Sequence, residues 1–71
     1  MFGFPRDRGA EEFERMRAAA ENERQTALAT ATDQAAVRSA EITFYRSLIV
    51  AAESNGIQAD TFRAALTELA K

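Results

Sequence analysis

The chain has 71 residues, of which 46% are hydrophobic, and its formal net charge is −2 at pH 7. It contains no cysteine and no histidine, which excludes disulfides, thiolate metal sites and the commonest general base. Nine basic residues against eleven acidic ones leave no basic excess of the kind that binds nucleic acid. A single small domain with a marginal core is expected, and association with another chain is the remaining way to stabilise it.

The first nine residues, MFGFPRDRG, are predicted to form an extended arm, 1–9. Pro5 disfavours the helical conformation of the residue before it. Phe2 and Phe4 are interpreted in two ways. They either fold back onto the chain's own first helix, or they dock as aromatic anchors on another chain.

A long helix over 10–55 is predicted next, because this stretch holds neither glycine nor proline and is rich in alanine. Pairs of opposite charge at helical spacing support it, namely Glu11–Arg15, Glu14–Arg17 and Glu21–Arg24. Its first half carries a narrow apolar stripe of Phe13, Met16, Ala20, Ala27 and Ala31. Its second half is apolar over a much wider arc, made of Val37, Ile42, Phe44, Tyr45, Leu48, Ile49 and Ala52.

A break in this helix near 30–33 is the alternative. Thr30 and Asp33 match the pattern of a helix N-terminus, with Thr30 as the capping residue. No glycine or proline is present there to make the turn, so the continuous helix is preferred and the break stays open.

The two alternatives differ in what they require of a partner. A continuous helix is too long for the short C-terminal helix to cover, so its alanine-rich stripe stays bare unless a second chain packs on it. This favours an antiparallel helical dimer. A broken chain could instead close into a three-helix bundle that needs no partner.

The C-terminal part is predicted to be a turn over 55–58 followed by a short helix over 59–70. Gly56 suits the left-handed position that ends a helix. Phe62, Leu66 and Leu69 follow at helical spacing and form an inner face. The segment 37–70 is therefore interpreted as an αα-hairpin.

The segment 52–66 also has the rhythm of a helix-turn-helix unit, with a small alanine before the turn and glycine in it. In that alternative Gln58 and Arg63 would contact DNA. Asp60 has the wrong sign for phosphate, and no basic surroundings supply affinity. Nucleic acid is therefore a disfavoured partner.

The overall expectation is an all-α, non-enzymatic interaction module that self-associates and binds another protein as inhibitor or adaptor, of the kind that phages encode. A structural part of a larger assembly, such as a phage particle, is a further alternative. No catalytic, metal or cofactor site is expected. The absence of a long apolar stretch and of a signal peptide predicts a cytoplasmic protein that does not enter a membrane.

Candidate partner-binding residues are Phe2, Phe4, Phe13, Met16 and Ala20. Candidate core or self-association residues are Val37, Phe44, Tyr45, Leu48, Ile49, Phe62, Leu66 and Leu69.

Overall fold

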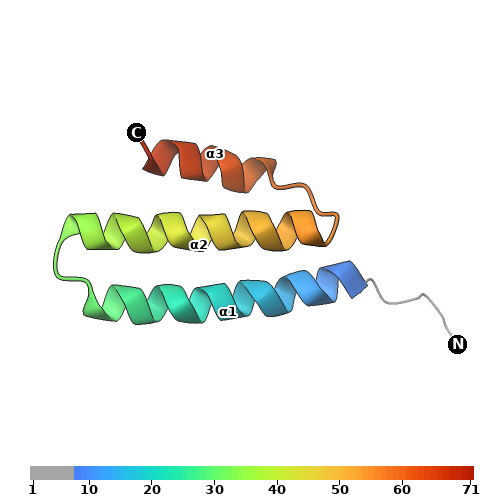
Figure 1. Cartoon of the computed structure of the whole chain (residues 1–71), viewed down its shortest axis with the longest axis horizontal. Helices are drawn as coiled ribbons and strands as arrows, with labels where there is room; N and C mark the ends of the chain where they lie inside the picture. Colours follow the sequence, from blue (N-terminus) through green and yellow to red (C-terminus); the bar gives the residue numbers. More distant parts are fainter. Residues whose placement is uncertain (1–7) are drawn as a thin grey trace, which may run out of the picture.

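A computed structural model describes residues 8–71, which fold into three α-helices (Figure 1). Helix α1 spans Arg8–Thr30, α2 spans Gln34–Ser54 and α3 spans Asp60–Leu69. The described residues contain no strand, so the all-α class is confirmed.

The single helix expected over 10–55 is wrong, because the chain leaves helical geometry at 31–33 and turns back on itself. Helices α1 and α2 consequently lie side by side in opposite directions (Figure 1). The alternative with a break near 30–33 is the one that the structure has. Glycine and proline were not needed, because packing α1 along α2 stabilises a turn that ordinary residues can form.

The capping residue of α2 is Asp33. The sequence pattern indicates Thr30 instead, and that prediction is wrong. Asp33 has extended backbone geometry, with φ −149°, and its carboxylate accepts a hydrogen bond of 2.8 Å from the amide of Ala36. Thr30 is the last residue of α1, and its hydroxyl donates to the carbonyl of Ala27 at 3.1 Å. An aspartate satisfies the otherwise unpaired amides at the start of a helix and suits the positive end of its dipole.

Helix α1 begins at Arg8. The extended arm expected over 1–9 is therefore too long by two residues. Phe2 and Phe4 lie outside the described residues.

The link between α2 and α3 depends on Gly56, which has a φ of +69°. Its amide donates to the carbonyl of Glu53 at 3.3 Å, and the amide of Ile57 donates to the carbonyl of Ala52 at 2.8 Å. These two bonds define a Schellman motif, in which a left-handed glycine ends the helix. A Cβ at Gly56 would meet nothing within 4 Å, so the backbone conformation alone accounts for the glycine.

Helix α2 is the middle element, with α1 along one side and α3 along the other (Figure 1). No Cα atom of α1 lies within 8 Å of a Cα atom of α3. The helices thus form an open layer and not the closed three-helix bundle considered for a broken chain. Only side chains join the outer helices, as Phe13 of α1 stacks on Phe62 of α3 with ring centroids 6.0 Å apart.

Small side chains dominate the buried core. Leu48, which is 4% exposed, is the one large hydrophobic side chain that is buried among the described residues. The other buried hydrophobic residues are Ala20, Ala40, Ala51, Ala52 and Ala59. The larger apolar side chains are half-buried, namely Phe13, Met16, Leu28, Ile42, Phe44, Tyr45, Ile49, Ile57, Phe62, Leu66 and Leu69.

Candidate interaction surface

The seam between α1 and α2 is made of small residues. Ala20 of α1 and Ala40 and Ala51 of α2 are buried there, which lets the two helices approach closely. Within the apolar stripe of α1, Ala20 is buried beside α2, Phe13 stacks on Phe62 of α3, and Ala27 is exposed. The expectation that only a second chain could cover this stripe applied to an unbroken helix, which the structure does not have.

A charged cluster around Arg24 also ties α1 to α2. The Arg24 side chain donates to Glu21 at 2.8 Å and to both carboxylate oxygens of Glu41 at 3.0 Å. Its guanidinium carbon lies 4.9 Å from the centre of the Phe44 ring, a distance typical of a cation–π contact. The hydrogen bonds to Glu21 and Glu41 raise the pKa of Arg24, which keeps it charged.

The charge pairs on the exposed side of α1 were partly predicted. Arg17 pairs with Glu14 at 2.7 Å, and this hydrogen bond lowers the pKa of Glu14. The pair Glu21–Arg24 is present too. Arg15, however, pairs with Glu12 instead of Glu11.

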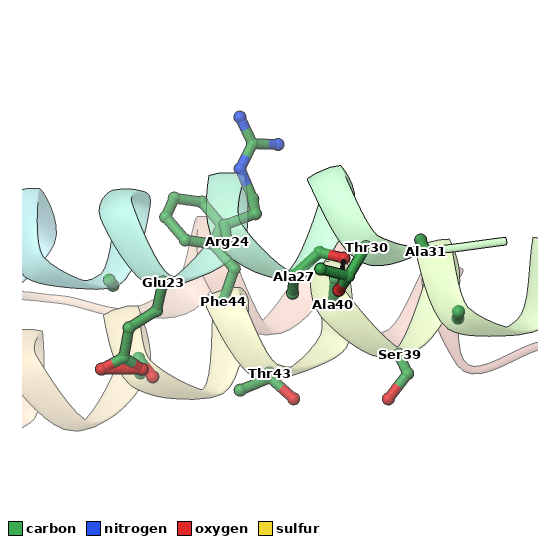
Figure 2. Close-up of a pocket in the computed structure, with 12 residues that line it drawn as sticks. Glu23, Arg24, Ala27, Thr30, Ala31, Ser39, Ala40, Thr43 and Phe44 are labelled. Atoms are coloured by element: carbon green, nitrogen blue, oxygen red, sulfur yellow. Dashed lines mark hydrogen bonds between the residues drawn. The ribbon is translucent and has the colours of Figure 1, made fainter.

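A hollow opens between α1 and α2 near the turn at 31–33 (Figure 2). Arg24 and Phe44 extend to one side of it, whereas Glu23, Thr43 and Ser39 extend to the other. Small side chains make up most of the lining, namely Ala20, Ala27, Ala31, Ala36, Ala40, Ser39 and Ser47.

A second hollow continues the first toward the N-terminal half of α1. The two share four lining residues, which are Ala20, Glu23, Thr43 and Ser47. The second hollow adds Met16, Ala19, Arg46 and Val50. These two hollows are adjacent, and together they are called the α1/α2 groove below.

The most exposed large hydrophobic side chain of the described residues, Val50 at 57%, lines this groove. Glu23 and Arg46 line it as well, and neither forms an ion pair within residues 8–71. The groove thus combines an apolar knob, a hollow of small residues and two charges without partners in the described chain.

Another hollow lies where all three helices meet, and its walls are Arg24, Glu41, Tyr45, Ala65, Glu68 and Leu69. The Phe44 and Tyr45 rings are in edge contact beside it, with centroids 5.4 Å apart. Because these rings are only half-buried, this hollow offers aromatic surface to a partner.

The residues that were predicted to bind a partner lie in different places. Phe13 stacks on Phe62, Ala20 is buried in the α1–α2 seam, and Met16 lines the α1/α2 groove, where its sulfur accepts a 3.7 Å contact from the Asn55 amide. Val37, a candidate core or self-association residue, is 41% exposed.

The residues proposed for DNA contact do not form a basic surface. Gln58 is exposed in the link before α3. Arg63 forms an ion pair with Glu53 of α2, which neutralises its charge. Helix α3 also begins with Asp60.

Some residues of the groove and seam were missed in the sequence. Ala40, Ser47 and Ala51 share one face of α2 with Phe44, which was predicted, and this row of small residues at helical spacing was a usable signal for the seam. Arg46 and Val50 carried no such signal, because nothing local distinguishes them from ordinary exposed residues.

No segment of the described residues is long and apolar enough to cross a membrane, and within them no cluster of three or more acidic side chains is placed to hold a metal ion. No family model matches the sequence, and comparisons with curated proteins and with solved structures find no match.

Proposed function

We propose that this chain is a small helical protein–protein interaction module that associates with itself and binds another protein as inhibitor or adaptor. The observation that supports the proposal most strongly is the poor coverage of its large apolar side chains. Leu48 alone among the described ones is buried, whereas the four aromatic rings of the described residues and most aliphatic side chains are half-buried. Apolar surface left in this state is typical of interaction sites.

The open layer explains why this surface remains. Helix α2 is wide in its apolar arc and has a neighbour on each side, yet α1 and α3 do not approach each other closely enough to close over it. A chain of 71 residues gains stability if a partner covers what is left.

The absence of catalysis stays a prediction from the lack of histidine and cysteine. The role of a structural part in a larger assembly would use the same surfaces. DNA binding receives no support, because Arg63 is paired with Glu53 and Asp60 stands at the start of α3.

Self-association is tested by light scattering behind a sizing column over a wide range of protein concentration. We expect the average mass to rise from the 7.8 kDa of one chain toward twice that value. A mass that stays at one chain throughout, for a protein that unfolds cooperatively, would contradict the proposal.

A further inference from the structure

We propose that the α1/α2 groove is a two-fold interface for a second copy of this chain. In it, Val50 of each copy enters the small-residue hollow of the other, and Glu23 of each copy pairs with Arg46 of the other. This inference rests on the proposed self-association and names the surface and contacts that carry it.

The shape of the groove is self-complementary. One end carries the exposed side chain of Val50 beside Met16, and the other end is hollow between Ala27 and Ala40. A two-fold axis through the middle of a patch places each end of it against the opposite end of the second copy. Each knob then meets a hollow, which is the packing that a stable helix interface requires.

The charges obey the same symmetry. Glu23 and Arg46 both line the second hollow of the groove, one from α1 and one from α2, and Glu23 also lines the first hollow. Both are exposed, and neither has an ion-pair partner within the described residues, whereas Arg17, Arg24 and Arg63 all have one. A two-fold axis between them exchanges their positions, so that each acid faces a base of the second copy.

This double complementarity favours a second copy over a different protein. An isologous interface uses the same patch twice, so the patch must contain both members of every contact. A surface for a foreign protein needs only one member of each pair. The groove holds both the knob and its hollow, and both the acid and its base.

The hollow where the three helices meet stays open in such a dimer, because its walls at Tyr45 and Leu69 are not part of the groove. The dimer therefore leaves Tyr45 and Leu69 of each copy for the target protein, and Arg24 lies between this hollow and the groove because it lines both. Because the groove offers only one face of two helices, a weak and reversible dimer is expected.

The decisive experiment reverses the two charges separately and together. Glu23→Arg and Arg46→Glu each place like charges together twice in the dimer. We expect each single variant to weaken dimerisation about tenfold or more and the double variant to recover most of the loss. Sedimentation equilibrium of the full chain measures the dissociation constant, and circular dichroism checks that both exposed substitutions leave the helices intact.

Matched controls separate the groove from general effects. Arg38→Glu makes the same charge change at an exposed position of α2 outside the groove, and it should leave dimerisation within about twofold of the parent chain. Val50→Ala should weaken the dimer, whereas Val37→Ala, at the other exposed valine, should not.

The outcomes distinguish this interface from the proposed function. If the parent chain dimerises but the single charge reversals have no effect, or the double variant recovers nothing, the groove is not the interface and self-association stands. If the parent chain is a monomer at every concentration, both the interface and the self-association are overturned.

Discussion

Helix α2 contacts its two neighbours by different means. Toward α1 it presents alanines and a charged cluster, with Ala40 and Ala51 buried and Glu41 bound to Arg24. The side chains that α3 turns toward α2 are large and apolar, namely Phe62, Leu66 and Leu69, and they are half-buried. Two small residues near the link between α2 and α3, Ala52 and Ala59, are buried as well.

The difference between the α1–α2 and α2–α3 contacts indicates that one contact contributes more to stability and the other more to binding. Small side chains bring helices close together but bury little apolar area each, so a seam of this kind contributes modestly and leaves grooves at its edges. Large side chains bury more area and stabilise more per residue. We therefore expect the core around Leu48 to dominate stability and the α1–α2 side to supply the interface.

The largest effect is expected from Leu48→Ala. This substitution leaves a cavity at the one large side chain that is buried within residues 8–71 and should lower the free energy of unfolding by about 3 kcal/mol. Urea denaturation followed by circular dichroism measures it. Val37→Ala removes two methyl groups from an exposed site of the same helix and should change the stability by less than about 0.5 kcal/mol. Equal losses in the two variants would mean that the core is not centred on Leu48.

A smaller effect is expected from the cap of α2. Asp33→Ala removes the acceptor for the Ala36 amide and should cost about 1 kcal/mol, because it weakens the start of α2 and the turn that lets α1 pack on it. Thr30→Ala, at the residue that the sequence pattern favoured, should be close to neutral. The same urea titration measures both. The reverse order of effects would return the capping role to Thr30.

The local features of the fold were predictable because they depend on neighbouring residues. Gly56 adopts the left-handed conformation expected of it, and the pairs Glu14–Arg17 and Glu21–Arg24 form at their helical spacing. The break at 31–33 was not preferred in the sequence, since each residue there tolerates a helix. The Asp33 cap is a local signal for the break, but the contact of α1 with α2 that stabilises the turn is not contained in any local pattern.

The candidate surface was predictable only in part, for a related reason. The large apolar residues of α2 were identified by their size, yet Val37 is exposed and alanines hold the buried seam. Which part of a wide apolar arc is covered depends on where the neighbouring helices lie. Val50 and Arg46 become candidate contact residues only because they line the groove that α1 makes with α2.

The smallest effect concerns the charged cluster that joins α1 to α2. The side chains of Arg24 and Glu41 are 27% and 25% exposed, and this pair bridges two helices. Those of Arg17 and Glu14 are 42% and 60% exposed and belong to one helix. A double-mutant cycle with Arg24→Gln and Glu41→Gln should therefore give a coupling free energy about twice that of the cycle with Arg17→Gln and Glu14→Gln.

Salt provides the control for this comparison. The exposed Glu14–Arg17 coupling should largely disappear in high salt, because ions screen charges that water already surrounds. The Arg24–Glu41 coupling should persist in part, since the Phe44 ring covers one face of the guanidinium and both carboxylate oxygens accept from it. If both couplings vanish together, the cluster is an ordinary surface pair, and α1 is held to α2 by its alanine seam alone.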